Sequence, residues 1–404
     1  MIKEIYQLKV IDTTLNVTQS RIDSIRKKNI VKTGCRVYEN GYIGVAGTFG
    51  EPSDETWETA IQNLNLKIPY EYEPSRDCRR IRDWRNHKLN ADDFLEKSEL
   101  LLAKLREEYP QFIFSNKISL KETEVSLKND VGLDLINYDN SVTVEVIYKH
   151  KDSVNIMDSY LTYTAREYDI DAILMEARNQ LTAFETIVAL PDIEKPIILD
   201  CFSSLSKVIE SLNGEALGRG TSIFCDKMGT RAFHEEFTLS IERKDPEYYH
   251  VPYFDAEGSV LEDDSTSLIE EGVIIKGYTD KKNSKLYNVA NTACAGADYD
   301  DVPSLETPSI SVKLSGKKLD ELIGDEPAIL CLFAEGGDCT NEGDFATPVQ
   351  MAFLYQNGKY LGRLPEFSLS GNIYDMFGDD YIGYSKDKPF FGQHAIASRM
   401  KVVR

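Results

Sequence analysis

The chain has 404 residues, a formal net charge of −21 and a hydrophobic content of 42%. A chain of this length and composition can form roughly two or three domains with hydrophobic cores. The acidic charge disfavours nucleic-acid binding, because a protein that neutralises phosphates needs a basic surface. No stretch approaches the roughly 20 apolar residues that span a bilayer, and the N-terminus lacks the apolar segment of a signal peptide. We therefore expect a cytoplasmic protein without a membrane partner.

Turn and helix-capping residues predict the secondary structure of the first part of the chain. Asn40-Gly41 between β-prone runs predicts a hairpin in a unit that runs from Gly34 to about Leu66, because both central positions of a type I′ turn need positive φ. After Pro52, Ser53 predicts a helix cap with Thr56 at the third helical position. A second helix, capped by Asn90 and ending before Pro110, is predicted by an apolar stripe. The stripe consists of Phe94, Leu95, Leu101, Leu102 and Leu105.

Short alternating runs follow between Phe112 and His150, broken at residues 129–130 and 137–140. This pattern predicts an antiparallel meander of short strands. A long helix is then expected from Asp171 to Leu190, closed by Pro191. The segment from Pro191 to Pro196 is the predicted boundary between two domains, residues 1–192 and 193–404.

The second half contains many short β-prone runs and few helical patterns. A strand at 197–200 is expected to lead into a helix at Ser203 or Ser204, and Asn357-Gly358 predicts a second hairpin. The sequence thus predicts an α+β fold: an N-terminal domain of hairpin–helix units, a meander and long helices, and a β-rich C-terminal domain. Further strands are expected near 233–241, 272–277, 309–314, 328–333 and 347–355, and short helices at 317–324 and 371–377.

The segment from Tyr253 to Gly296 contains Phe254-Asp255-Ala256-Glu257-Gly258, then Ile269-Glu270-Glu271-Gly272-Val273, then Asn291-Thr292-Ala293-Cys294-Ala295-Gly296. It resembles the core signature of the TldD/TldE (PmbA) family. The resemblance implies a peptide-processing metalloprotease complex, whose members were also named modulators of DNA gyrase. One kind of subunit in this family carries zinc on a helical His-Glu-x-x-x-His motif, and the other kind lacks the motif.

The resemblance places the counterpart of the histidine motif at Ser203–Asn213, upstream of Arg219-Gly220-Thr221-Ser222, and this segment contains no histidine. The chain therefore resembles the zinc-less TldE/PmbA kind. No cofactor is expected in it, and zinc is expected only in a TldD-type partner. The family's late cysteine ligand corresponds loosely to Cys339, but one thiolate without histidines makes no tight zinc site.

His234-Glu235 is the only His-Glu pair of the chain, and the positions of a second histidine are held by Thr238 and Leu239. Period-two alternation over residues 233–241 predicts that His234 lies on the polar face of a strand. We predict no catalytic residue and no metal ligand, with Cys339 and His234 as the alternative metal site. The peptide-cleft candidates that the resemblance implies are Asp255, Glu257, Gly258, Asn283 and Ser284. The alternative for residues 255–258 is a structural turn whose carboxylates cap backbone groups.

Two functions remain open at this stage. The first is a non-catalytic TldE/PmbA-like subunit that pairs with a zinc-bearing TldD-type subunit, or with itself as a homodimer. It would help to form a chamber in which an extended, unfolded peptide adds as a β-strand and is cut by the partner. The second is a self-sufficient metallo- or thiol peptidase that uses Cys339 and a spatially close histidine.

Overall fold

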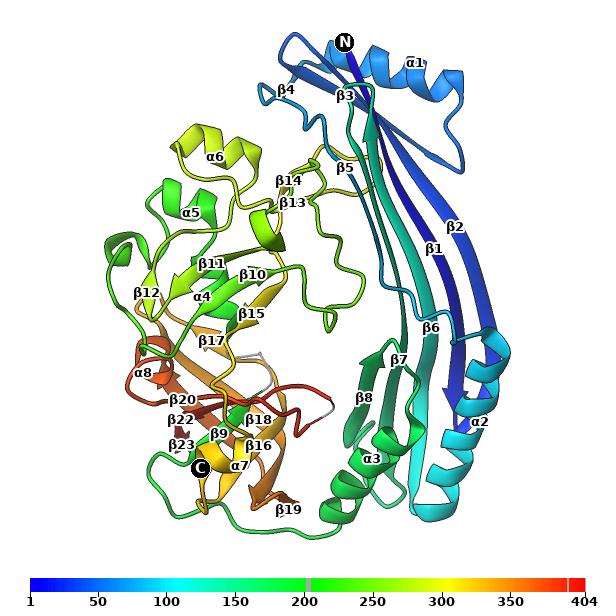
Figure 1. Ribbon diagram of the computed structural model, residues 1–404. Helices are drawn as coiled ribbons and strands as arrows, with labels where there is room; N and C mark the ends of the chain where they lie inside the picture. The colour runs from blue at the N-terminus through cyan, green and yellow to red at the C-terminus, as the bar shows by residue number, and fades with distance from the viewer. Residues whose placement is uncertain (201–204, 391, 404) are drawn as a thin grey trace.

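The computed structural model describes residues 1–200, 205–390 and 392–403. In Figure 1 the N-terminal half forms one tall sheet on the right, and the C-terminal half lies to its left. Within the described residues, the first half builds an eight-stranded sheet, and the second half builds a nine-stranded sheet and two smaller ones. The fold class is α+β, as the sequence predicts. Over the same residues, none of the helices is both long and apolar enough to cross a membrane.

The N-terminal sheet has the order β4-β3-β2-β1-β6-β7-β5, and β8 pairs with a different stretch of β7 from the one that β5 contacts. Its neighbouring strands are antiparallel except for β5, which runs parallel to β7. The strands are β1 (Ile2–Thr18), β2 (Arg21–Glu39), β3 (Tyr42–Phe49), β4 (Ile68–Pro69), β5 (Arg79–Asp83), β6 (Phe112–Asn129), β7 (Asp134–His150) and β8 (Ser159–Ala165).

The predicted hairpin and helix caps of this half are confirmed. Asn40 and Gly41 have φ of 53° and 79° between β2 and β3. Ser53 caps α1 (Asp54–Asn63) in a capping box with Thr56. Asn90 caps α2 (Ala91–Glu108), whose buried face includes most of the predicted stripe. These features follow from local chemistry, which a sequence displays directly.

Two predictions for the N-terminal half are wrong. The predicted break at 137–140 is absent, because β7 continues through it; Asp139 is buried there and paired with Arg166 at 2.7 Å. The predicted helix 171–190 is shorter: α3 spans Ile170–Phe184. After α3 the chain turns to the C-terminal half, where the Val188 amide donates to the Arg363 carbonyl at 3.0 Å.

The large C-terminal sheet has the order β21-β22-β9-β16-β18-β20-β23, with β17 and β19 also paired to β18. The predicted strand 197–200 and the Asn357-Gly358 hairpin are confirmed, whereas the predicted helix start at Ser203 or Ser204 lies outside the described residues. The helices are α4 (Ser206–Ser211), α5 (Gly214–Gly218), α6 (Lys281–Tyr287), α7 (Leu319–Ile323) and α8 (Ile373–Met376).

The remaining strands of the C-terminal half are short except for β18. A second sheet has the order β12-β11-β10-β15, and β13 pairs with β14. The strands are β9 (Ile197–Asp200), β10 (Leu239–Glu242), β11 (Ser265–Glu270), β12 (Val273–Ile274), β13 (Ala295–Gly296), β14 (Ser304–Leu305), β15 (Ile310–Val312), β16 (Ala328–Ala334), β17 (Asp338–Cys339), β18 (Asp344–Gln356), β19 (Lys359–Arg363), β20 (Phe367–Asn372), β21 (Tyr381–Tyr384), β22 (Ile396–Arg399) and β23 (Lys401–Val403).

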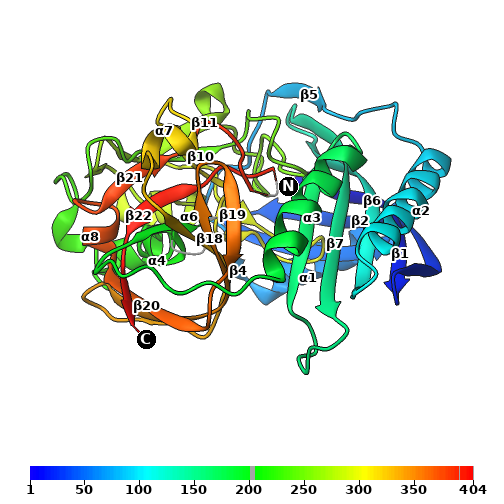
Figure 2. The same ribbon diagram turned by 90° about the horizontal axis from the view of Figure 1, so that it is seen from below.

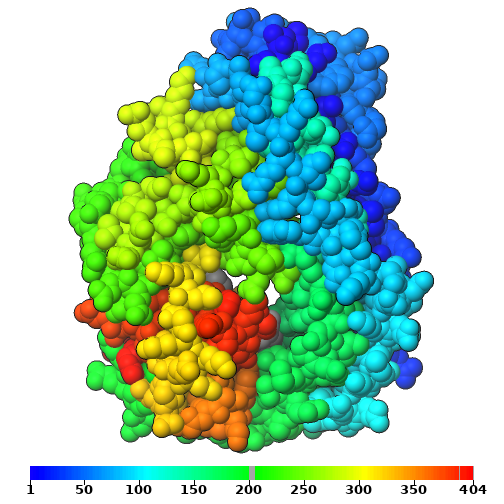
Figure 3. All heavy atoms as spheres, viewed as in Figure 1, coloured from blue at the N-terminus to red at the C-terminus, as the bar shows by residue number. Residues whose placement is uncertain are grey.

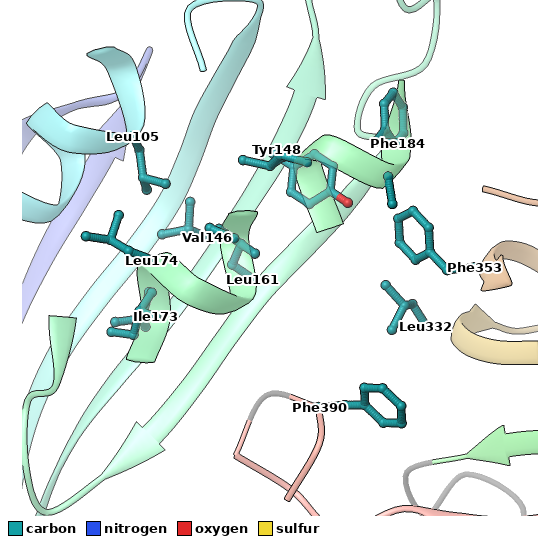
Figure 4. Close-up of a cluster of buried hydrophobic side chains, with 14 of the residues drawn as sticks. Leu105, Val146, Tyr148, Leu161, Ile173, Leu174, Phe184, Leu332, Phe353 and Phe390 are labelled. Carbon is teal, nitrogen blue, oxygen red and sulfur yellow. The ribbon is translucent and has the colours of Figure 1, made fainter. Parts of the chain in front are cut away.

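One hydrophobic core joins the two halves. Figure 2 shows α3 beside the C-terminal half, with α2 farther from it. In Figure 4, Tyr148 and Phe184 of the N-terminal half lie close to Leu332 and Phe353 of the C-terminal half. Because this apolar cluster crosses the predicted boundary at 192/193, the division into two domains stays a prediction.

Candidate functional site

A cavity of about 580 Å³ lies between α4 and the β17–β18 hairpin of the C-terminal half. Ser206 of α4 (Ser206–Ser211) and Cys331 of β16 both line it. Lys207 and Glu210 of α4 line the cavity and form an ion pair at 3.4 Å. Cys339 of β17 lines the same cavity. Residues of the 203–213 segment and Cys339, which the sequence analysis compares with the family's metal ligands, therefore line one cavity.

The chemistry of this cavity is that of a thiol beside an ion pair. Burial raises the pKa of the Cys339 thiol, Lys207 acts in the opposite direction, and Glu210 and Asp338 add to the rise. A raised pKa keeps the sulfur protonated, and a protonated thiol is a poor nucleophile and a poor metal ligand. The donor set also does not fit zinc, because the described residues of the cavity lining include no histidine and the Lys207 ammonium would repel a cation.

The structure does not bring His234 to Cys339. His234 is outside the cavity lining, and its ring lies 5.8 Å from that of Tyr381. The prediction that it lies on a strand is wrong, because β10 begins only at Leu239. The chain turns at residues 234–237 instead, and the His234 amide donates to the Phe377 carbonyl at 2.8 Å. Among the described residues, no group of three or more His, Cys, Asp or Glu side chains is placed to hold a metal.

The signature segment forms a buried turn between the halves. Asp255 Oδ1 accepts hydrogen bonds from the Glu257 and Ser259 amides at 2.9 and 2.8 Å, and Oδ2 accepts one from the Ala295 amide at 3.1 Å. Both carboxylate oxygens thus accept hydrogen bonds from backbone amides, which is the geometry expected of the structural turn. A place in a peptide cleft stays a prediction for this residue.

Glu257 connects the turn to both halves. Its Oε1 accepts from the Tyr70 hydroxyl and its Oε2 from the Lys281 amide, each at 2.9 Å. Burial, and secondarily the charge of Asp255, raise the pKa of Glu257 to about 7. Gly258 follows with φ of +70°, and a Cβ there would lie within 2.9 Å of Leu133 and Leu127 side-chain atoms. The turn is therefore packed against β6 and the β6–β7 connection.

The two remaining cleft candidates lie on α6. Asn283 is buried, and its side-chain amide donates to Asp280 Oδ1, the cap of the helix, at 2.8 Å. The Ser284 hydroxyl donates to the Val289 carbonyl at 2.6 Å. The Asn283 side-chain nitrogen and the Ser284 hydroxyl are thus used within the 280–289 segment, whereas the buried Asn283 Oδ1 has no hydrogen-bond partner among the described residues. Their role in peptide binding stays a prediction.

Sequence reasoning missed the partner of the signature turn, Arg36. Its guanidinium is fully buried and contacts Glu4 Oε1 at 3.4 Å and the Ala256 carbonyl at 2.5 Å. It also lies over the ring of Tyr6 at 4.7 Å. The sequence did contain a signal for it, because Arg36 is a single charged residue within an apolar run of the predicted hairpin. A buried arginine needs hydrogen-bond acceptors, and these can come from elsewhere in the fold.

A second cavity, of about 630 Å³, lies between the halves and is called the interdomain cleft below. One wall is the polar face of β6, β7 and β8, and the other consists of residues from 245–251, Ser311 and Leu314, and Tyr384, Lys388 and 392–394. Figure 3 shows a hollow where the yellow-green and red segments meet the cyan and green strands. Five serine and threonine side chains share the sheet wall: Ser119, Ser141, Thr143, Thr162 and Thr164.

His250 closes one end of the interdomain cleft. Its two ring nitrogens lie 2.9 Å from Thr123 Oγ1 on β6 and from Ser141 Oγ on β7. Burial and the nearby Lys121 lower the pKa of His250 to about 4, although Asp139 acts in the opposite direction. A neutral imidazole between two hydroxyls is therefore a structural connection between the halves at neutral pH.

Comparison with known proteins matches this architecture. The family model of the PmbA/TldA metallopeptidase C-terminal domain matches residues 197–402. The crystal structure of TldE from Thermococcus kodakarensis has a TM-score of 0.84 at 19% identity, covering 100% of this chain and 97% of that chain. An uncharacterised protein of Methanocaldococcus jannaschii is 21% identical over 93% of this chain and 89% of its own length. The metalloprotease TldD homolog of Buchnera aphidicola is 28% identical over 42% of this chain and 36% of its own length.

The chain is an α+β protein whose C-terminal half matches the family model of the PmbA/TldA metallopeptidase C-terminal domain. The chain belongs to the PmbA/TldD family, since the family model covers just over half of it. The likeness to the Thermococcus structure shows that the fold extends over the whole chain.

Proposed function

We propose that this chain is a non-catalytic, TldE/PmbA-like subunit of a peptide-processing metalloprotease complex. The observation that supports the proposal is the α4–β17 cavity, which brings together Lys207, Glu210 and a Cys339 thiol of raised pKa; the sequence resemblance aligns this helix and, loosely, this cysteine with the family's histidine motif and late cysteine. A TldD-type partner would supply zinc, and this subunit would contribute part of the chamber that holds the unfolded peptide. A homodimer is the alternative assembly.

The test compares metal content and peptide cleavage for the purified protein alone and mixed with a TldD-type subunit. The proposal predicts less than stoichiometric zinc and no cleavage alone, with cleavage in the mixture. One equivalent of zinc together with cleavage by the isolated chain would instead establish the self-sufficient peptidase.

A cysteine variant sharpens this comparison. Cys339→Ser should leave cleavage by the mixture unchanged, because the proposal gives this thiol no part in the chemistry. Cys331→Ser is the matched control, since Cys331 lines the same cavity from β16. Loss of cleavage in Cys339→Ser, with activity kept in Cys331→Ser, would contradict the proposal.

A further inference from the structure

A small cavity of about 260 Å³ lies where the signature turn meets the N-terminal sheet. Its lining includes Tyr6 of β1 and segments 254–256, 294–297 and 306–309 of the C-terminal half. Arg243, the residue that follows β10, also lines this cavity, which is called the arginine cavity below. Figure 1 shows β13, which contributes to the lining, beside the upper part of the tall sheet.

Arg243 is a buried cation without a counter-ion. It is 7% exposed, and among the described residues it forms no ion pair with a carboxylate. Its Nη2 donates to the Ala293 carbonyl, whereas Nε and Nη1 are buried and have no hydrogen-bond partner in the described part of the chain. Burying a charge is costly unless it is paired, and burying an N–H is costly unless it has an acceptor. This guanidinium therefore lacks both a negative charge and hydrogen-bond acceptors.

Backbone contacts fix Arg243 at the arginine cavity. Its amide donates to the Asp264 carbonyl at 2.9 Å, and its carbonyl accepts a hydrogen bond from Arg82 Nη1. Arg82 belongs to β5, so the N-terminal half helps to hold this part of the C-terminal half. An anion that enters the cavity would meet a cation already in position, which reduces the entropic cost of binding.

Arg36, the other buried arginine at the signature turn, is balanced within the chain. Its Nη1 lies 3.4 Å from Glu4 Oε1 and also donates to the Ala256 carbonyl. Arg36 Nε and Nη2 have no partner among the described residues either, but Arg36 does not line the arginine cavity. Of these two arginines, the one without a counter-charge is therefore the one that lines a cavity.

Tyr6 supplies a second hydrogen-bond donor to the arginine cavity. Its side chain is 8% exposed, and its ring lies 4.7 Å from the Arg36 guanidinium. Among the described residues, the Tyr6 hydroxyl makes no hydrogen bond. Burial raises the pKa of Tyr6, although Arg36 acts in the opposite direction, so the hydroxyl stays protonated and can donate. A guanidinium and a hydroxyl are the donors with which proteins recognise a carboxylate.

Two carboxylates of the chain, Asp255 and Glu306, also line the arginine cavity. Both Asp255 oxygens accept backbone amides and are committed to the signature turn. Glu306 is exposed and lies against Gly296, where a Cβ would be 1.5 Å from Glu306 Oε2. Because water and salt screen an exposed charge, Glu306 weakens anion binding only moderately.

We propose that the arginine cavity is a carboxylate-binding site, in which the carboxylate of a small organic acid or of a peptide end balances Arg243 and accepts a hydrogen bond from Tyr6. The cavity is smaller than the roughly 300–1,000 Å³ of typical ligand pockets, which limits the bound group to a few heavy atoms. The inference does not depend on the proposed function.

Acetate is the probe that tests the site in the wild-type protein. Isotope-labelled acetate, titrated in place of chloride at constant ionic strength and followed by NMR relaxation, should show saturable binding. Arg243→Met removes the charge and should weaken this binding at least about thirtyfold. Tyr6→Phe keeps the ring and removes only the hydroxyl, so it should weaken binding by about threefold to tenfold. The Tyr6 variant keeps the test decisive if Arg243→Met does not fold.

Two further variants serve as controls. Glu306→Gln removes a competing negative charge and should strengthen acetate binding by about twofold to fivefold. Arg219→Met, at an exposed arginine outside the cavity lining, should change it less than about twofold. The site would be overturned if wild-type protein showed no saturable acetate binding, or if Tyr6→Phe bound acetate as tightly as wild type.

N-acetylalanine and its amide separate the two sources of the carboxylate. Binding of N-acetylalanine at least about tenfold tighter than acetate would assign the site to the end of a peptide, and a smaller difference would assign it to a free acid. Binding of the uncharged amide as tightly as the acid would overturn the carboxylate site.

Discussion

Gly258 and Gly220 have nearly the same backbone φ, +70° and +72°, in very different surroundings. A Cβ at Gly258 would lie 2.8 Å from Leu133 Cδ2, whereas a Cβ at Gly220 would meet nothing within 4 Å. Gly220→Ala should therefore cost only the conformational strain, about 1 kcal/mol. Gly258→Ala should cost about 1–3 kcal/mol more, because it also overpacks the contact between the signature turn and the N-terminal sheet. Urea unfolding of both variants measures the difference, and equal costs would show that the turn is not tightly packed.

Glu257 makes stability depend on pH in an unusual direction. Its pKa is about 7 in the folded protein, against its usual value of 4.5. Between these values the folded state binds more protons than the unfolded state, so this residue's contribution to stability is complete below pH 4.5 and falls as pH rises to about 7.

Glu257→Gln removes this titration and keeps the shape of the protonated side chain. Relative to wild type, the variant should gain about 1–3 kcal/mol in unfolding free energy as pH rises through this window. Urea unfolding across a pH series measures the gain, and Glu235→Gln, at an exposed carboxylate, is the control. A difference between Glu257→Gln and wild type that does not change with pH would contradict the raised pKa.

At the scale of the elements, Arg166 holds the 245–250 segment on β7. Its Nε and Nη2 each lie 2.7 Å from an oxygen of Asp139, and it also donates to the carbonyls of Pro246 and Tyr248. Asp139 is 1% exposed in this pair. Arg166→Met would leave a buried carboxylate without its cation, and should cost about 3–5 kcal/mol.

The exposed ion pair between Arg178 and Glu108 gives the matched control for Arg166. These two side chains lie 3.5 Å apart and Arg178 is 65% exposed, so Arg178→Met should leave the free energy of unfolding nearly unchanged. Chemical unfolding of both variants tests the contrast. A loss below about 1 kcal/mol for Arg166→Met would mean that Asp139 is stabilised by backbone amides alone.

The ion pair between Arg166 and Asp139 shows why the sequence predicted some structural features correctly and others wrongly. Asn-Gly turns and helix caps depend on neighbouring residues, and they were predicted correctly. The break predicted at 137–140 is wrong because the polar residues of β7 are satisfied by partners far along the chain, such as Arg166 and Arg82. The first half of β2 has no alternation of buried and exposed residues, because most of its side chains are exposed.

Some features of the candidate sites could likewise be predicted from the sequence, and others could not. The absence of histidine at 203–213 could be read from the sequence. The meeting of α4 with Cys339 depended on the family resemblance, since more than a hundred residues separate them. The interdomain cleft had no sequence signal, because its walls come from four separate parts of the chain that are individually ordinary strands and loops.

At the scale of the whole molecule, the halves share a core and should unfold together. Phe353 of β18 is fully buried in the cluster that also contains Phe184 of α3. Phe353→Ala should cost about 3–5 kcal/mol. Both tryptophans, Trp57 and Trp84, lie in the N-terminal half and report on its unfolding alone.

If the shared core couples the halves, this substitution in the C-terminal half lowers the midpoint of the tryptophan fluorescence transition. The fluorescence midpoint should shift together with the midpoint of the calorimetric transition. Phe49→Ala, at a 69% exposed phenylalanine, is the control and should shift neither midpoint by more than about 0.5 kcal/mol in equivalent free energy. A tryptophan transition unmoved by Phe353→Ala would show that the N-terminal sheet folds independently, and would then support the boundary at residues 192/193 as a true domain division.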